Sequence, residues 1–205
     1  SLVYPSSAAA AAAAAALTDK NKDKDTKYLH TKVYTGQFVA GLRNGVGKLV
    51  FPSGANYEGQ WSQDSKHGLG EYTFANGDIY RGDFVKDKRS NQGIIKYKNG
   101  NVFDGQWMND KRIFGSLRYA TNKNEYIGQF SADGKMMEGQ GKFTWAADCS
   151  TYEGEWVSDM AHGYGTYTCK TYRYEGNWVN NKKQTVPLSP SAAAALAASP
   201  VSASV

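Results

Sequence analysis

The chain has 205 residues, a formal net charge of +5, 22 glycines and an aromatic content of 13%. Its two cysteines, Cys149 and Cys169, are too few for a disulfide framework, and no Asn-x-Ser/Thr glycosylation sequence occurs. Both absences favour an intracellular, reducing compartment over secretion.

The first 33 residues stand apart from the rest of the chain. They hold nine consecutive alanines at residues 8–16 and an alternating charge run at residues 19–25. Alanine favours helix, but isolated helices below about 12–15 residues are marginal in water. The run is too short to span a bilayer, and it lacks the basic start and leucine-rich core of a good signal peptide. We expect residues 1–33 to form a flexible tail or one ordered by a partner.

A repeating unit follows, and it is clearest where the sequence reads YEGQW, six further residues, GLGEYTF and then Asn76-Gly77. Side chains alternate between the two faces of a strand, so Tyr57, Gly59 and Trp61 share one face while polar residues take the other. Asn-Gly is a strong tight-turn signal. Each unit therefore predicts a β-hairpin with a six-residue loop between its strands and a turn that leads to the next unit.

Glycines recur at fixed positions on the aromatic face, although glycine weakens a strand interior. We expect them to leave a flat patch on which a neighbouring tyrosine or tryptophan ring lies. Bulges or flexible points are the alternative. Most units also have a glycine at the end of the loop, such as Gly68 in the second unit. The third and fourth units have Asn91 and Ile113 at this position, which we interpret as drift rather than a special contact.

The unit occurs six times, followed by a half unit. Its copies start at Tyr34, Tyr57, Tyr80, Phe103, Tyr126, Tyr152 and Tyr174. The spacings are 23, 23, 23, 23, 26 and 22 residues, and a fixed period of this size indicates a tandem array. We assign residues 34–185 to the array. Residues 186–205, rich in Pro, Ala and Ser, are expected to form a flexible or weakly ordered tail.

Charge is unevenly distributed along the array. Residues 33–80 hold three Lys/Arg against four Asp/Glu, residues 81–123 hold ten against four, and residues 124–185 hold six against eight. The basic patch predicted from the middle segment consists of Arg81, Lys86, Lys88, Arg89, Lys96, Lys98, Lys111, Arg112, Arg118 and Lys123. Such a patch fits an acidic protein surface, anionic lipid or nucleic acid, and a solvated loop edge is the alternative.

No constellation of catalytic or metal-binding residues is found. His67 and His162 lie four repeats apart, too far to share a metal, and two cysteines without further ligands make no zinc site. The Gly-x-Gly pairs never extend to Gly-x-Gly-x-x-Gly, and neither HExxH nor GxSxG occurs. We expect no enzyme activity, no metal and no cofactor.

The pattern Y-x-G-x-W…H-G-x-G-x-Y-x-F-x-x-G resembles the MORN repeat. Close matches are residues 57–61 with 66–70, and residues 152–156 with 162–165. The resemblance implies an all-β fold: one elongated, twisted antiparallel sheet of tandem hairpins. Similar proteins are scaffolds, among them radial spoke head components of cilia and flagella, cytoskeletal organisers of protists, and modules attached to lipid kinases or methyltransferases. In such proteins the aromatic face can clasp a partner segment.

A single sheet can bury only one face, and the ring surface left exposed on it would form an apolar contact site. The predicted partner-binding residues on this aromatic face are Tyr57, Trp61, Tyr72, Phe74, Phe84, Tyr97, Trp107, Tyr119, Trp145, Trp156 and Trp178. For each of them alone, packing in the core is the competing role.

We expect a non-catalytic scaffold of a ciliary, flagellar or other cytoskeletal assembly, located in the cytoplasm, the cytoskeleton or the axoneme of a cilium. Its expected partners are other protein subunits, and a homodimer or heterodimer is compatible with this role. The first alternative is a peripheral membrane protein that binds acidic phospholipid through the basic patch. A regulatory subunit of an enzyme is a further alternative. Nucleic acid is not expected as a partner, because the aromatic residues are committed to the sheet.

Overall fold

The computed structural model describes residues 31–184, and all regular structure in this part of the chain is β-strand. The strands are β1 Val33–Val39, β2 Leu42–Val50, β3 Asn56–Ser62, β4 Ser65–Thr73, β5 Ile79–Val85, β6 Lys88–Lys96, β7 Val102–Met108, β8 Lys111–Arg118, β9 Glu125–Phe130, β10 Met137–Trp145, β11 Ser150–Val157, β12 Met160–Thr168, β13 Arg173–Val179 and β14 Lys182–Lys183. The two predicted tails lie outside the described residues, apart from residues 31–33.

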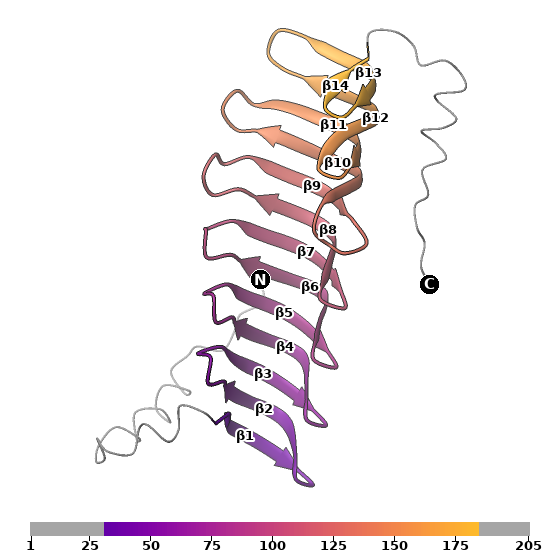
Figure 1. Cartoon of the computed structure of the whole chain (residues 1–205). Helices are drawn as coiled ribbons and strands as arrows, with labels where there is room; N and C mark the ends of the chain where they lie inside the picture. The colour runs from indigo at the N-terminus through magenta and orange to yellow at the C-terminus, as the bar shows by residue number, and fades with distance from the viewer. Residues whose placement is uncertain (1–30, 185–205) are drawn as a thin grey trace.

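The strands form one 14-stranded antiparallel sheet whose spatial order is the chain order. Every strand pairs only with its sequence neighbours, so the hairpins β1/β2 to β13/β14 are stacked in one column, as Figure 1 shows. The first and last strands do not pair, and the sheet is not closed. The prediction of an all-β sheet of tandem hairpins is confirmed. The final half unit gains a two-residue partner strand, β14, which the sequence reading did not include.

The six-residue loop predicted inside each hairpin is wrong in length for all hairpins except the fifth, where residues 131–136 connect β9 to β10. β3 ends at Ser62 and β4 starts at Ser65, so only Gln63 and Asp64 form the turn. Both have positive φ, 47° and 64°, as a two-residue type I′ turn requires. The strands therefore continue through most of the residues that were expected to be loop. The turns between hairpins agree better: Gly77, with φ at 93°, closes one of them by donating its N–H to the carbonyl of Phe74.

The first six hairpins each carry a bulge or register shift close to the connection between their two strands. Between the pairs Gly59–Gly70 and Trp61–Lys66, β3 advances two residues while β4 advances four. Gly68 lies in this bulge with φ at 61°, a conformation that favours glycine. At the equivalent place in the third hairpin Asn91 keeps a positive φ of 53°, which asparagine tolerates.

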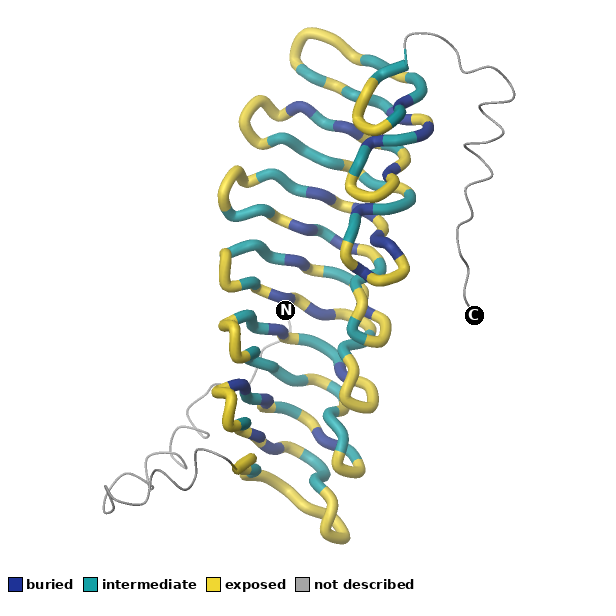
Figure 2. Tube along the Cα trace, in the orientation of Figure 1, coloured by how far each residue is buried: buried dark blue, intermediate teal, exposed yellow. Residues whose placement is uncertain are grey.

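Aromatic rings form the core on one face of the sheet. Each repeat contributes a tyrosine or phenylalanine and a tryptophan or phenylalanine that meet edge to face, and each of these first rings also meets the second ring of the next hairpin. The ring centroid of Tyr57, for example, lies 5.1 Å from that of Trp61 in its own hairpin and 5.1 Å from that of Phe84 in the next. Edge-to-face pairs at this separation are favourable beyond the area they bury. A continuous ladder of rings therefore links the hairpins, and Figure 2 shows buried positions recurring along the column between two exposed edges of turns.

The glycines of the aromatic face make room for these rings, as predicted. A Cβ added to Gly70 would lie 2.4 Å from Cε2 of Tyr57, and one added to Gly59 would lie 2.7 Å from the Tyr57 hydroxyl. The ring thus lies flat over a pair of glycines, and its hydroxyl donates a hydrogen bond of 2.7 Å to the carbonyl of Gln60. The bulge leaves Gln60 without a partner residue on β4, although it pairs with Val46 on β2.

The fourth hairpin differs from the others in a consistent way. β8 is one residue shorter than β4, and Gln106 is in register with Phe114 instead of being skipped. The ring over its glycines is Phe103, which has no hydroxyl to donate. The fourth hairpin therefore lacks both the unpaired residue of the bulge and the hydroxyl that bonds to its carbonyl in the other hairpins. Ile113 lies in this shortened bulge and has no positive φ.

The opposite face of the sheet is less polar than strict alternation predicts. Between the two glycines of β2, β4 and β12 it carries exposed Val46, Leu69 and Tyr164, and Phe114 of β8 is 44% exposed. Lysine and carboxylate pairs lie beside these residues, such as Lys48 with Glu58 at 3.1 Å. This face is a mixed surface, whereas the aromatic face carries the core.

Candidate functional site

Turn residues tie the hairpins to one another along the edge that carries the turns inside the hairpins. Between the fourth and fifth hairpins the Arg112 side chain does this by donating to the carbonyls of Gly134 and Lys135. Asp64 accepts hydrogen bonds from the backbone N–H of Arg43 at 2.8 Å and from its Nε at 3.0 Å. The same contact, from turn side chain to the backbone N–H one hairpin earlier, is made by Asp110 to Arg89 at 3.0 Å and by Asp159 to Met137 at 2.7 Å. The positions just after the turns are therefore fixed at a constant place above the rings.

A row of cations occupies these fixed positions in the first four hairpins. The cation row consists of Arg43, Lys66, Arg89 and Arg112. The guanidinium carbon of Arg43 lies 4.2 Å from the centre of the Trp61 ring, and that of Arg112 lies 4.5 Å from Phe130. Lys66 Nζ lies 4.8 Å from Tyr72, and burial lowers the pKa of this lysine. Cations at these distances are attracted to the ring faces, so the row covers part of the aromatic core.

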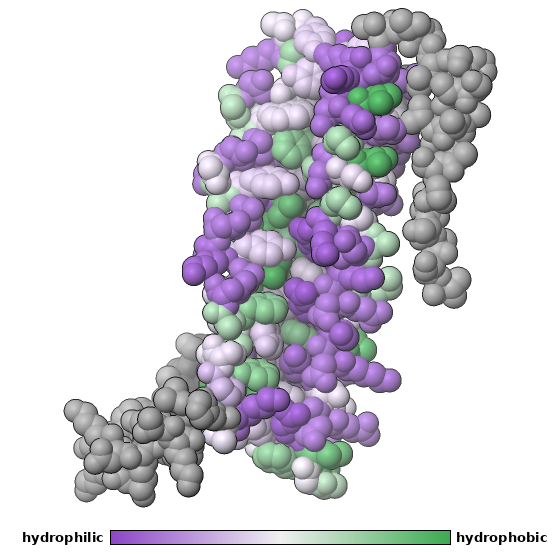
Figure 3. Space-filling model, viewed as in Figure 1, coloured by the Kyte–Doolittle hydropathy of each residue, from purple (hydrophilic) through white to green (hydrophobic). Residues whose placement is uncertain are grey.

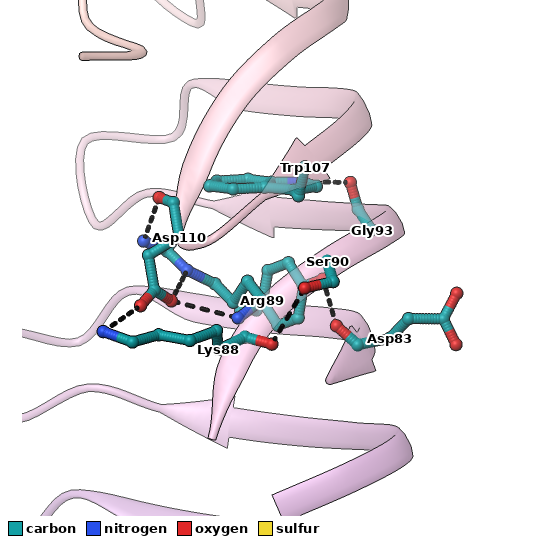
Figure 4. A network of polar contacts seen from close by, with 8 residues as sticks. Asp83, Lys88, Arg89, Ser90, Gly93, Trp107 and Asp110 are labelled. Atoms are coloured by element: carbon teal, nitrogen blue, oxygen red, sulfur yellow. Dashed lines mark hydrogen bonds and ion pairs between the residues drawn. The ribbon is translucent and has the colours of Figure 1, made fainter. Parts of the chain in front are cut away.

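Arg89 shows the complete arrangement (Figure 4). Its guanidinium lies 4.3 Å from the Trp107 ring, its Nε donates to Oδ1 of Asp110 at 3.1 Å, and its Nη2 donates to the Asp110 carbonyl at 2.9 Å. Lys88 pairs with the second carboxylate oxygen at 3.3 Å. Burial raises the pKa of the Asp110 carboxyl, but the hydrogen bonds from Arg89 outweigh it and the pKa lies below its ordinary value. A ring, a carboxylate and a carbonyl together hold one cation.

The row is interrupted in the fifth and sixth hairpins. Met137 and Ala161 take the positions of the arginines, and a cation returns only at Lys183, whose Nζ lies 4.3 Å from Tyr172. The supporting contacts persist, because the N–H groups of Met137 and Ala161 are still bound by Asp159 and Asn181, the latter at 2.8 Å. The covering side chain changes in both hairpins, and the fifth also has a six-residue connection, residues 131–136, in place of a two-residue turn.

A groove of about 520 Å³ lies where the cation row is interrupted. This aromatic groove is floored by Trp156 and Trp178 and flanked by the half-buried rings of Phe143, Trp145 and Tyr167. Asp159, Met137, Ala161 and Lys183 also line it. Figure 3 shows apolar and aromatic side chains in a column along the array, with hydrophilic side chains on its flanks. Apolar grooves of this volume with a few polar groups are typical of binding sites.

The predicted partner-binding residues fall into two rows. Six are almost completely buried in the ring ladder: Tyr57, Trp61, Phe84, Trp107, Trp156 and Trp178. The other five are partly buried and pack against it: Tyr72, Phe74, Tyr97, Tyr119 and Trp145. The outer row keeps exposed ring surface, while the inner row packs in the core of the sheet. Trp145, Trp156 and Trp178 are brought together in the aromatic groove.

The ten residues of the predicted basic patch do not share one surface. Arg89 and Arg112 belong to the cation row, whereas Arg81 and Arg118 lie on the opposite face and pair with Glu71 and Glu125. Lys88 pairs with Asp110, and Lys123 donates to the Ala120 carbonyl. Apart from Lys123, four patch lysines form no ion pair among residues 31–184: Lys86, Lys96, Lys98 and Lys111. They are exposed but divided between the two edges of turns and the opposite face.

The other chemical candidates remain apart. His67 lies on β4 and His162 on β12, and Cys149 and Cys169 are free thiols. Within residues 31–184, no three His, Cys, Asp or Glu side chains come close enough together to hold a metal ion. The same residues include no helix with the length and apolar character needed to cross a bilayer.

Sequence reasoning overlooked the cation row and its interruption. The signal is present, because the row lies five residues after the Phe or Trp of its hairpin in the first four repeats, as from Trp61 to Lys66. The same spacing gives Ala161 and Lys183 in the last two units. In the fifth unit Met137 lies seven residues after Phe130, and its equivalence follows from its pairing with Phe130 in the sheet. Arg89 and Arg112 were instead counted as surface charge.

The comparisons with known proteins agree with this repeat. The family model described as "MORN repeat" matches residues 34–55, 57–79, 80–102, 103–112, 126–150, 152–172 and 174–184. No curated protein matches the sequence significantly.

Two solved structures with distant similarity are TCP domains. One is the TCP10 domain of Danio rerio CPAP in complex with a peptide of Danio rerio STIL, with 16% identity, a TM-score of 0.41 and coverage of 68% of this chain and 60% of that one. The other is the TCP domain of Drosophila melanogaster SAS-4 in complex with a proline-rich motif of Ana2, with 12% identity, a TM-score of 0.30 and coverage of 72% and 90%. This chain thus spans 60% of the length of the CPAP domain.

Proposed function

The chain belongs to the MORN-repeat family, a family of non-catalytic repeats for protein or membrane interaction, and from this premise we propose that it is a scaffold subunit of a ciliary, flagellar or other cytoskeletal assembly. It binds other protein subunits through its aromatic face and has no catalytic activity of its own. The cytoskeletal or axonemal location comes from the resemblance to radial spoke head and cytoskeletal MORN proteins.

The observation that carries protein binding is the aromatic groove. The rings of Phe143, Trp145 and Tyr167 beside it are only partly buried, and the ring centroids of Trp145 and Tyr167 lie 6.0 Å apart. Large rings gathered in a hollow are the usual energetic centre of a protein interface. In the first four hairpins the equivalent rings are partly covered by the protein's own cations, so binding is expected at the C-terminal end of the array.

Acidic phospholipid is a weaker fit. Half or more of the basic patch is engaged within the protein, and its free lysines are divided between different surfaces. A flat membrane attracts cations that face it together, each worth about 1 kcal/mol. Liposomes containing phosphatidylserine at low salt are therefore expected to bind the chain poorly, and charge reversal at Lys96 and Lys98 is expected to change little.

Crosslinking mass spectrometry in an extract of the source cells tests the proposal. We expect crosslinks from Lys142, Lys170 and Lys183 to cytoskeletal or axonemal proteins, and we expect Tyr167→Ala to remove them. Tyr164→Ala is the matched control, because Tyr164 lies on the same strand but is 54% exposed on the opposite face. Circular dichroism confirms that both variants fold.

Retention of the crosslinks in Tyr167→Ala, or recovery of the chain only with lipid, would contradict the proposal. Crosslinks that join two copies of the same lysine would identify a homodimer, and crosslinks to a related repeat protein a heterodimer.

A further inference from the structure

We propose that the aromatic groove receives an arginine or lysine side chain from a partner protein, in the place where the first four hairpins supply their own. The inference builds on the proposed function, since it specifies which feature of a protein partner the aromatic face recognises. It follows from comparing equivalent positions within one chain.

The occupied positions define what such a cation requires. Arg43 and Arg89 each have a tryptophan ring of the next hairpin at 4.2 and 4.3 Å. Each also has an aspartate Oδ1 of the next turn at 3.0 and 3.1 Å, and a backbone carbonyl of the same aspartate. The two sites lie two hairpins apart and repeat the same three contacts, so the arrangement is a property of the repeat.

The fifth hairpin retains these parts without the cation. Trp156 follows as the ring of the next hairpin, and Asp159 follows as its turn aspartate, with Oδ1 held by the Met137 N–H at 2.7 Å. Asp159 is exposed and forms no ion pair within residues 31–184, unlike Asp64 and Asp110. The carboxylate and the ring face therefore lie together beside a hollow, with no cation between them.

The sixth hairpin enlarges the hollow. Ala161 has only a methyl group where the first four hairpins have a cation, and the turn residue bound to its N–H is the neutral Asn181. The only carboxylate that lines the groove is that of Asp159, and the only cation is Lys183 at its far end. An incoming cation is thus directed to the Asp159 end, away from Lys183.

Charge and sequence indicate that the cation comes from another molecule. Residues 124–185 hold eight Asp/Glu against six Lys/Arg, so this end of the array attracts a basic segment, while the middle segment repels one. Residues 185–205 contain neither lysine nor arginine, and the five lysines of residues 1–32 precede β1, at the opposite end of the sheet from the groove. A partner segment with one basic side chain among apolar neighbours matches both the ring walls and the single carboxylate.

The test starts from a display library of random 12-residue peptides selected on the full chain. The best peptide is then synthesised with its arginine and with citrulline, which keeps the planar shape and removes the charge; for a lysine, acetyl-lysine serves. We expect the neutral version to bind about tenfold more weakly, as is typical when a charge-assisted bond and a cation–π contact are lost.

Three protein variants test whether the peptide binds in the aromatic groove. Asp159→Asn removes the charge but keeps an acceptor for the Met137 N–H, as Asn181 does for Ala161, so folding is retained and affinity is expected to fall about tenfold. Met137→Arg supplies the cation from within the chain and is expected to abolish binding. Met108→Arg, the same substitution at a 58% exposed site, is the control and is expected to leave binding unchanged.

The results distinguish a failure of the cation proposal from a failure of the proposed function. Equal binding of the charged and neutral peptides, or unchanged affinity in Asp159→Asn, overturns the role of the cation, while the proposed function stands if Tyr167→Ala still abolishes binding. Failure to select any peptide, or binding that ignores Tyr167→Ala, counts against both. Self-association of the chain that Met137→Arg dissolves would make a second copy the occupant and would also overturn the inference.

Discussion

The first four hairpins and the hairpins from the fifth onward share the same ring ladder but differ in what covers it. In the former, Arg43, Lys66, Arg89 and Arg112 lie over the rings; in the latter, Met137 and Ala161 leave a groove of about 520 Å³. The difference arises at one position of the repeat. It teaches that the glycines and rings specify the sheet, while the side chain after the turn decides whether a hairpin covers its own aromatic face or leaves a groove there.

The largest expected effect tests whether the two regions share one framework. Gly70→Ala and Gly165→Ala each push a methyl group to 2.4 Å from the tyrosine of their hairpin. Overpacking of this kind costs about 1–3 kcal/mol, and we expect similar losses in both regions, measured by urea unfolding. Gly41→Ala, with φ at +79° and no atom within 4 Å of the new methyl group, serves as the control for backbone strain alone.

If Gly165→Ala were neutral while Gly70→Ala were severe, the two regions would not share the ring-over-glycine packing.

The next prediction exchanges the side chain after the turn, which is Arg89 in one region and Met137 in the other. Arg89→Met removes the ring contact and the bonds to Asp110, and we expect a loss of about 1–3 kcal/mol in the free energy of unfolding. Met137→Arg places a guanidinium between Trp156 and Asp159 and is expected to be neutral or stabilising by up to about 1 kcal/mol. Denaturant unfolding measures both, with Met108→Arg as control. Strong destabilisation by Met137→Arg would show that the fifth hairpin lacks the cation site.

A smaller effect is expected at the tyrosine hydroxyls. Tyr57→Phe and Tyr152→Phe each lose a hydrogen bond to the carbonyl three residues later and should cost about 1 kcal/mol in either region. The reverse change, Phe103→Tyr, should give no gain, because Gln106 of the fourth hairpin already has a partner residue in the ladder. Thermal unfolding measures all three, and stabilisation by Phe103→Tyr would contradict this explanation of the fourth hairpin.

The smallest expected effect is a loss of folding stability at alkaline pH. Burial raises the pKa of Tyr57, Tyr80, Tyr126 and Tyr152, two in each region, because it disfavours the phenolate. Their stability contribution is complete below the unfolded pKa of about 10 and is lost as the pH rises above it. The urea midpoint should therefore be constant from pH 8 to 9.5 and fall above pH 10. Phenolate absorbance that rises fully without unfolding would contradict the burial of these rings.

The sequence was enough to predict the hairpins and the role of their glycines. Alternation places Tyr57 and Trp61 on one face, and the 23-residue period makes each hairpin repeat the last. Turn length was not predictable from hydrophobic alternation, since Gln63-Asp64 adopts a two-residue turn through its φ angles rather than through composition.

The candidate site was only partly predictable. The rings of the groove were named, but an alternation pattern does not show that Lys66 or Arg112 bends over a ring of the next hairpin. It also treats Met137 and Ala161 as ordinary apolar residues. The groove exists because a side chain is absent at a place where three-dimensional stacking expects one, and that information appears only when equivalent positions are compared in space.

The most direct test observes the five indole N–H signals of the chain by NMR while the arginine peptide selected on the full chain is added. Trp61 and Trp107 lie under their own arginines, whereas Trp145, Trp156 and Trp178 line the groove. We predict chemical-shift changes at the latter three and none at the former two. Shifts at Trp61 or Trp107, or shifts spread equally over all five, would contradict the distinction between the two regions.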